Sequence, residues 1–288
     1  MYDQKPWLKF YGDVPASLDY PRTTMVEALR LSAARHPDAV AYDYLDHAFT
    51  YEQFVRDIEQ CASALAALGL KSGDRMTIAL PTIPQGIIAF YAANRVGAVA
   101  SMIHPLSTAS EIAYYLTVSK SRMALILKDH IDKFREAQKD APSQILITTT
   151  LTDAIDRGRG NPAVSGDSDP AVKVWRSLMA GSYPPAPESS MGPDDLAAIL
   201  YSGGTTGQPK GIMLSNYNFI SEGMMTSAFR KITHGDKRMV MVASLPIFHG
   251  FGLGICCNAM FMSGATSILV PTFTPDTLAE ILVKKKPT

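Results

Sequence analysis

Residues 76–148 alternate short apolar runs with longer amphipathic segments, and this alternation constrains the fold of the chain more than any other feature. Apolar runs of about four to eight residues between turn signals are typical of strands that are buried on both faces. Strands that alternate with helices form parallel sheets, because each helix returns the chain to the edge at which the next strand begins. We therefore predict an α/β fold with parallel-rich sheets sandwiched by helices. The predicted strands span residues 76–80, 99–103, 123–127 and 144–148, and the predicted helices span residues 85–96, 110–119 and 131–141.

Three helix starts are marked by a capping box, in which a threonine is followed three residues later by Glu or Gln. These threonines are Thr24, Thr50 and Thr108. The helix that begins at Thr24 should end at His36-Pro37, because a residue before proline avoids helical geometry. The helix after Thr50 has apolar residues at helical spacing and should end at Gly69. Residues 40–45 and 48–51 predict a hairpin between these two helices.

Composition divides the chain into four parts. Residues 1–22 are punctuated by proline and are predicted to form an extended N-terminal arm. Residues 23–152 are predicted to form a first α/β subdomain, and residues 194–288 a second, incomplete α/β subdomain. Residues 153–193 are rich in Gly, Pro and Ser. We interpret them as a surface insertion or linker with one helical piece around residues 172–179, because so polar a segment cannot offset the entropy of ordering a core.

The second subdomain continues the alternation of strands and helices. A helix is predicted from Ser215 or Asn216 to Phe229, followed by a strand over residues 239–245. A buried helix and a strand near residues 266–270 come next, and Thr274-Pro275 opens a last helix.

Charge and cysteine content exclude several classes of function. The 27 basic and 27 acidic residues balance, so the chain has no long-range attraction for nucleic acid or anionic lipid. Three cysteines without a C-x-x-C pair and a polar start at residues 1–10 indicate free buried thiols in a cytoplasmic protein. Residues 239–275 carry no formal charge, but prolines and glycines divide them into pieces too short to span a bilayer. No transmembrane segment is predicted, whereas peripheral membrane contact and the oligomeric state stay open.

The stretch 201–211, Tyr-Ser-Gly-Gly-Thr-Thr-Gly-Gln-Pro-Lys-Gly, follows an apolar run at residues 196–200. A strand that leads into a glycine-rich turn can present backbone N–H groups to phosphate oxygens. The hydroxyl groups of the loop can donate to phosphate or bind a metal, and Lys210 adds a positive charge. A P-loop NTPase or kinase is disfavoured, because Lys210 is followed by Gly211 and Ile212 rather than by Ser or Thr. The remaining alternative is a Gly/Thr hairpin with a solvated lysine.

The loop and four other segments resemble, in the expected order, the adenylate-forming (ANL) superfamily, which includes acyl-CoA synthetases, luciferases and the adenylation domains of peptide synthetases. The four other segments are Lys5-Pro6-Trp7-Leu8, Phe49-Thr50-Tyr51, Leu70-Lys71-Ser72-Gly73-Asp74-Arg75 and Leu245-Pro246-Ile247-Phe248-His249. Gly203 and the Trp-Leu opening look most like the fatty-acid–CoA ligase branch. The resemblance covers essentially the whole chain.

The resemblance implies that a fatty acid is activated by ATP as an acyl-adenylate and that its acyl group is then transferred to coenzyme A. It implies ATP, Mg²⁺ and coenzyme A as cofactor and co-substrates, with the protein supplying position and positive potential. Lys210 and His249 are the implied catalytic residues, and His249 would lie beside the acyl carboxylate at the mouth of an acyl pocket. Ser202 would reach the metal. The implied nucleotide-binding residues are Ser202, Gly203, Gly204, Thr205, Thr206, Gly207 and Lys210.

Several residues keep a structural alternative. Ser202 has the alternative of an ordinary turn serine, and His249, in an apolar run, that of a satisfied core histidine. His104, which precedes Pro105, is interpreted as structural. Met224, Met225 and residues 256–262 either line an acyl tunnel or pack in the core.

The superfamily's later acidic segment, ribose-binding aspartate, hinge and C-terminal lid domain with its catalytic lysine have no match in the sequence. We therefore expect the N-terminal part of a ligase, which folds but does not catalyse. Two further functions stay open: a non-catalytic nucleotide- or acyl-binding module, and another adenylate-forming enzyme such as an aryl-acid ligase or a luciferase-like protein. The sequence does not determine the length of the acyl chain.

Overall fold

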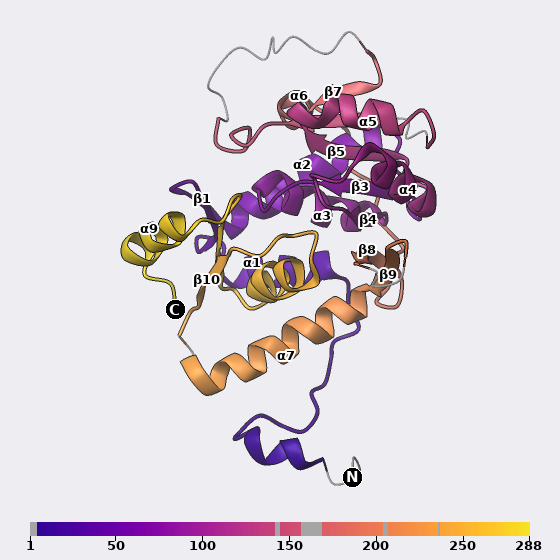
Figure 1. The fold of residues 1–288 in the computed structure, drawn as a ribbon. Helices are drawn as coiled ribbons and strands as arrows, with labels where there is room; N and C mark the ends of the chain where they lie inside the picture. Colours follow the sequence, from indigo (N-terminus) through magenta and orange to yellow (C-terminus); the bar gives the residue numbers. More distant parts are fainter. Residues whose placement is uncertain (1–4, 142–144, 157–168, 204–206, 236) are drawn as a thin grey trace.

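Parallel pairing dominates the two sheets of the computed structural model, which describes residues 5–141, 145–156, 169–203, 207–235 and 237–288 (Figure 1). The larger sheet has the strand order β7-β6-β5-β3-β4-β8-β9 and the smaller one the order β10-β11-β1-β2. Only β9 and β2 run antiparallel to their neighbours, β8 and β1, among the described pairs. The predicted α/β fold with parallel-rich sheets is thereby confirmed. The strands of the larger sheet are β3 (Arg75–Ala79), β4 (Val99–Met102), β5 (Met123–Leu127), β6 (Ile145–Thr149), β7 (Val172–Val174), β8 (Leu196–Ser202) and β9 (Lys210–Ser215), and those of the smaller sheet are β1 (Val40–Tyr44), β2 (His47–Thr50), β10 (Val240–Ala243) and β11 (Thr266–Leu269).

Most helices begin where the sequence predicts them, because capping residues satisfy the free N–H groups of the first turn. The capping boxes at Thr24, Thr50 and Thr108 are all formed, and Thr274 caps the last helix. The α-helices are α1 (Met25–Arg35), α2 (Tyr51–Ala67), α3 (Pro84–Val96), α4 (Ala109–Ser119), α5 (Ile131–Ala137), α6 (Trp175–Ala180), α7 (Asn216–His234), α8 (Met260–Met262) and α9 (Pro275–Lys285). The described residues also contain the short 3₁₀ helices η2 (Pro6–Phe10) and η3 (Lys128–His130) and the π-helix η4 (Phe251–Ala259).

The central strands β3, β4 and β5 of the larger sheet are buried on both faces, as their continuous apolar residues require. Successive residues of β5 show this, since Met123 and Leu125 belong to the main core and Ala124 and Ile126 to a second core. The second core is closed by residues of α4 and α5, which lie beside the sheet in the upper part of Figure 1. Helices therefore cover both faces of the sheet, because alternate residues of its strands belong to two different cores and each core contains helix residues.

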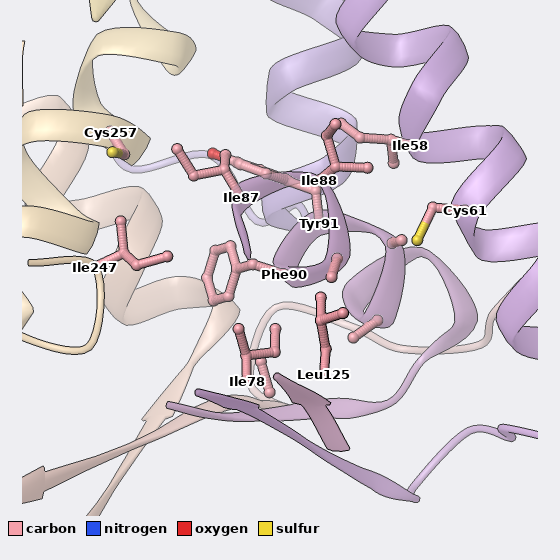
Figure 2. Packing of buried hydrophobic residues seen from close by; sticks show 14 of the residues in the cluster. Ile58, Cys61, Ile78, Ile87, Ile88, Phe90, Tyr91, Leu125, Ile247 and Cys257 are labelled. Carbon is pink, nitrogen blue, oxygen red and sulfur yellow. The ribbon is translucent and has the colours of Figure 1, made fainter. Parts of the chain in front are cut away.

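Helix α3 is buried along its whole length and forms the centre of the main core. Figure 2 shows Phe90 and Tyr91 of this helix between strand residues such as Ile78 and groups on other elements, among them Cys257. A helix that is apolar on all sides can only be stable when it is enclosed in this way. The same core reaches Tyr42 and Leu269, so it joins the two sheets.

The interpretation of residues 153–193 as a surface insertion without core residues is wrong for the described part of this segment. Residues 172–174 form β7, which pairs in parallel with β6, and Trp175 and Leu178 are buried in the main core. The 3-residue strand is too short to show a pattern, and Trp175, the first residue of α6, stands in a segment dominated by Gly, Pro and Ser. The buried Arg95 also donates hydrogen bonds to the carbonyl oxygens of Ala186 and Pro187, which fixes the segment against α3.

The predicted subdomain limits stay a prediction, and each sheet combines strands from both predicted subdomains. Strand β8 pairs with β4 in the larger sheet, and β11 pairs with β1 in the smaller one. Several boundaries differ from the sequence prediction; among the larger differences, α5 ends at Ala137, α7 continues to His234, and β10 spans only Val240–Ala243. Helix α7 continues because the next residue with positive φ is Gly235.

Two further sequence predictions concern membranes and thiols. Among the described residues, no helix is both long and apolar enough to cross a bilayer. The cysteines Cys61, Cys256 and Cys257 are free and buried. Burial raises the pKa of the Cys256 thiol to about 11, so this thiol stays protonated at neutral pH.

Two buried asparagines connect three helices. Asn216, the first residue of α7, accepts hydrogen bonds through its Oδ1 from the Met25 N–H at 3.1 Å and from Asn94 Nδ2 at 2.8 Å. Its Nδ2 donates to the Gly192 carbonyl oxygen at 3.0 Å, and Asn94 Oδ1 accepts from the Val26 N–H at 3.3 Å. The first N–H groups of α1 are therefore satisfied by side chains from α3 and α7.

We predict that Asn216→Ala lowers the free energy of unfolding by about 2–4 kcal/mol, because it leaves several buried polar groups without partners. Urea denaturation of the two proteins measures this difference. Asn218→Ala is the matched control, since Asn218 lies on the same helix but is exposed and bonds only Ser215; it should cost about 1 kcal/mol or less. Equal losses of unfolding free energy in both variants would show that the buried hydrogen-bond network stabilises the fold no more than the exposed one does.

Candidate functional site

The glycine-rich loop closes a hairpin between β8 and β9. Ser202, the last residue of β8, lies directly opposite Lys210, the first residue of β9. Both residues are exposed, as are Gly203 and Gly207, and nothing lies within 4 Å of the place where a side chain at either glycine would begin. The predicted site residues Gly204, Thr205 and Thr206 lie outside the described residues. The hairpin therefore presents a hydroxyl group, a lysine and bare backbone on an open surface.

Tyrosine side chains hold both ends of the hairpin loop in place. The Tyr114 hydroxyl donates to the Pro209 carbonyl oxygen at 2.9 Å. The Tyr201 hydroxyl and Ser101 Oγ lie 3.0 Å apart, and the Tyr201 ring packs on Tyr115 with the centroids 4.4 Å apart. Burial raises the pKa of Tyr201, so its hydroxyl stays neutral. Helix α4 and strand β4 thereby fix the base of an otherwise exposed loop.

His249 lies in the turn that connects β10 to the π-helix η4. It is exposed, so it is not a core histidine. The Phe251 N–H donates to its Nδ1 at 3.2 Å, which leaves the proton of the neutral ring on Nε2. The turn requires glycine at position 252, because a side chain there would begin 2.1 Å from the Pro246 carbonyl oxygen.

The turn that carries His249 lies beside the hairpin that carries Ser202 and Lys210. A side chain at Gly250 would begin 3.7 Å from Cδ1 of Leu200, which lies in β8 two residues before Ser202. Ligands of open α/β sheets bind at the carboxyl ends of the parallel strands, and the parallel strands β4 and β8 both end here. The structure therefore brings together the two groups of residues that the sequence predicts as a site.

His104 lies at the same edge of the larger sheet, just after β4. It is exposed, and its Nδ1 accepts a hydrogen bond from the Leu106 N–H at 2.9 Å. Its ring lies 4.4 Å from the ring of Phe248, the residue before His249.

Comparison with known proteins bears on this geometry. A family model described as AMP-binding enzyme matches residues 29–288. The chain belongs to this family. The resemblance to the adenylate-forming superfamily is thereby confirmed.

Named relatives of this AMP-binding enzyme are CoA ligases. It is 28% identical to a long-chain-fatty-acid–CoA ligase of Bacillus subtilis over 100% of this chain and 53% of the relative. It is also 28% identical to 4-coumarate–CoA ligase 1 of Petroselinum crispum, over 83% of this chain and 41% of the relative. The solved long-chain-fatty-acid–CoA ligase of Archaeoglobus fulgidus has a TM-score of 0.79 at 20% identity, over 94% of this chain and 52% of that one, which shows a shared fold. The chain thus spans about half the length of the curated relatives it matches.

Ser202 is the residue that the sequence predicts to bind a magnesium ion. No group of three or more His, Cys, Asp or Glu side chains that could hold a metal occurs in the described parts of the chain. Proteins usually hold Mg²⁺ through one or two carboxylates together with substrate phosphates. Ser202 supplies a single hydroxyl, so a magnesium ion here would depend on phosphate oxygens of the nucleotide for most of its ligands.

The residues predicted to line an acyl tunnel lie on two different sides of α7. Met224 lines a cavity of about 630 Å³ together with Ser227, Ala228 and residues 12–15 and 18 of the N-terminal arm. Cys256 and Cys257 of η4 pack in the main core instead. The acyl tunnel stays a prediction.

The tyrosine anchors of the loop were not among the predicted site residues. Tyr201 opens the glycine-rich stretch, but its partner Ser101 lies 100 residues earlier in the sequence. Only the parallel pairing of β4 with β8 brings the two together. Gly211 has a packing role, because a side chain there would begin 3.1 Å from Cγ2 of Ile199 and 3.4 Å from the Tyr201 ring.

Glu222 of α7 is a half-buried carboxyl group against η4. A side chain at Gly254 would begin 3.1 Å from its Oε2, which is buried and has no hydrogen-bond partner among the described residues. Its Oε1 accepts a bond from Thr226 Oγ1 at 3.0 Å. Burial raises the pKa of this carboxyl above its ordinary value of 4.5.

We predict that Glu222→Gln raises the melting temperature at pH 7 by about 2–4 °C but leaves it unchanged at pH 4. A folded-state pKa above the unfolded one destabilises the folded state as pH rises, and the penalty is absent when both states are protonated. Thermal unfolding at the two pH values measures the difference. Glu136→Gln on an exposed face of α5 is the control. A gain at pH 7 that persists at pH 4 would contradict the electrostatic explanation.

Proposed function

We propose that this AMP-binding enzyme takes part in the ATP-dependent activation of a fatty acid and its transfer to coenzyme A. The observation that carries the proposal is the pairing of Ser202 with Lys210 at the mouth of an exposed glycine-rich loop, beside the turn of His249. The glycine-rich loop with Ser202 and Lys210 suits phosphate, and His249 suits a carboxylate. The names of the relatives support a carboxylic acid and coenzyme A as the substrates.

The loop would bind the phosphates of ATP. Its exposed glycines leave room for oxygens to approach the backbone N–H groups, and Lys210 supplies the positive charge. Because Tyr114 and Tyr201 hold the base of the hairpin, the loop need not reorganise as charge moves onto the leaving pyrophosphate. The Ser202 hydroxyl would bind Mg²⁺ alongside phosphate oxygens.

His249 would orient the carboxylate of the acid. Its Nδ1 is occupied by the Phe251 N–H, so the neutral ring offers Nε2–H as a donor. The side chain is exposed and stands on a rigid turn that only glycine at position 252 permits. Holding the carboxylate at the α-phosphorus converts a bimolecular reaction into an effectively unimolecular one.

An aryl acid is the second candidate substrate, because the identity to the 4-coumarate–CoA ligase is the same 28%. Exchange of labelled pyrophosphate into ATP, measured on the whole protein with dodecanoate or 4-coumarate, separates the two. Exchange with dodecanoate alone supports the proposal, and exchange with 4-coumarate alone contradicts the fatty acid. An acyl-adenylate analogue that binds without any exchange would favour a non-catalytic binding module.

We predict that Lys210→Ala weakens the binding of Mg-ATP by about tenfold to hundredfold, because a hydrogen bond to a charged group is lost. Isothermal titration calorimetry measures the Kd. The melting temperature should be unchanged, since Lys210 is exposed. Lys139→Ala removes an exposed lysine near the end of α5 and is the control for charge alone. Equal affinities for Lys210→Ala and the control would remove Lys210 from the phosphate site.

We predict that His249→Ala weakens the binding of dodecanoate by about tenfold or more while Mg-ATP binding stays within about threefold. The Kd of each ligand is measured separately. His47→Ala, which removes another exposed histidine in the β1–β2 hairpin, is the control. Equal losses for both ligands together with a lowered melting temperature would show a structural role for His249.

A further inference from the structure

We infer that His104 is a substrate-contacting residue whose Nε2–H donates a hydrogen bond to an anionic oxygen of the acid or of the nucleotide phosphate. This inference rests on the proposed function. From the sequence alone His104 is interpreted as structural, whereas its surroundings in the structure favour contact with a ligand.

The register of the larger sheet places His104 next to the phosphate loop. Strands β4 and β8 run parallel, with Met102 opposite Leu200. Two residues beyond this pair lie His104 on one strand end and Ser202 on the other. Neighbouring strands are about 4.8 Å apart. Along this edge His104 just after β4, Ser202 at the end of β8 and Lys210 at the start of β9 therefore follow one another.

The imidazole of His104 is held in one tautomer. The Leu106 N–H donates to its Nδ1 at 2.9 Å, so the neutral ring carries its proton on Nε2. The side chain is exposed, and no described residue forms a hydrogen bond with Nε2. His249 is held in the same way, since its Nδ1 accepts from the Phe251 N–H. Two histidines thus offer free Nε2–H donors near the same loop.

Phe248 couples the orientation of His104 to the turn of His249. The rings of His104 and Phe248 lie 4.4 Å apart at an angle of 50°. Phe248 packs against the main core, so it provides a fixed surface for the imidazole. A donor that is already oriented loses little entropy when it binds a ligand. A fixed, exposed N–H at the open edge of a phosphate-binding loop suits an anionic oxygen, which accepts stronger hydrogen bonds than a neutral one.

Two substitutions separate the roles of the two ring nitrogens. In His104→Asn the side-chain oxygen can still accept the Leu106 N–H, but no group reaches the place of Nε2. In His104→Gln the amide nitrogen can reach that place, but the bond to Leu106 is lost. The inference predicts that His104→Asn weakens binding by about tenfold to hundredfold and that His104→Gln stays within about threefold of the wild type.

The experiment measures Kd by calorimetry for the wild type and both variants with three probes: Mg-ATP, dodecanoate, and a dodecanoyl-adenylate analogue with a sulfamate in place of the phosphate. A loss in His104→Asn with Mg-ATP assigns the bond to a phosphate oxygen, and a loss with dodecanoate assigns it to the carboxylate. A loss seen only with the analogue assigns the bond to the joined intermediate. Each of these results supports the inference if His104→Gln binds the same probe within about threefold of the wild type.

Two outcomes would overturn it. If the wild type binds the probes and His104→Asn binds them equally well, or His104→Gln is the weaker variant, the Leu106 bond alone explains the histidine and the inference fails while the proposed function stands. If the wild type binds none of the three probes, the proposed function fails, and the inference fails with it. The melting temperatures of the variants show whether either substitution disturbs the fold.

Discussion

The hydrogen bond between Asn94 and Asn216 determines how the candidate site is attached to the rest of the protein. It joins the enclosed helix α3 to the first residue of α7. Both side chains also accept hydrogen bonds from the first N–H groups of α1. Strand β9 ends at Ser215, immediately before Asn216. The exit of the β8–β9 hairpin is therefore fixed to the most buried part of the molecule. Because the network is fully satisfied and excluded from water, removing any member leaves costly unpaired groups.

The site is rigid at its base and open at its surface. Tyr114 and Tyr201 hold the two ends of the loop, while Ser202, Lys210 and His249 are exposed. The packing that orders the loop comes from α4 and β4, which carry none of the predicted phosphate-binding residues. The exposed side chains of the site can thus be substituted without loss of the fold, because other residues hold the ends of the loop in place.

Local sequence signals predicted much of the fold, and partnerships between distant residues were out of reach. Capping boxes predicted the starts of α1, α2 and α4, because cap and helix lie within four residues of each other. Strand β7 was missed, since three residues show no periodicity and its stability comes from β6. For the site, the loop and His249 carried recognisable patterns. The approach of His104 to Phe248 joins segments that are far apart in the sequence and follow strands of different sheets, which no local pattern encodes.

The pairing of β1 with β11 has a consequence for synthesis of the chain. Tyr42 lies opposite Ser267 in this parallel pair, a separation of 267 − 42 = 225 residues. At a translation rate of about 5–20 residues per second, the edge of β1 waits roughly 11–45 seconds before its partner has been made. During this time the β1–β2 hairpin exposes unpaired backbone and the buried faces of Tyr42 and Tyr44. The first hairpin of the smaller sheet therefore stays open to wrong strand pairing until β11 has been made.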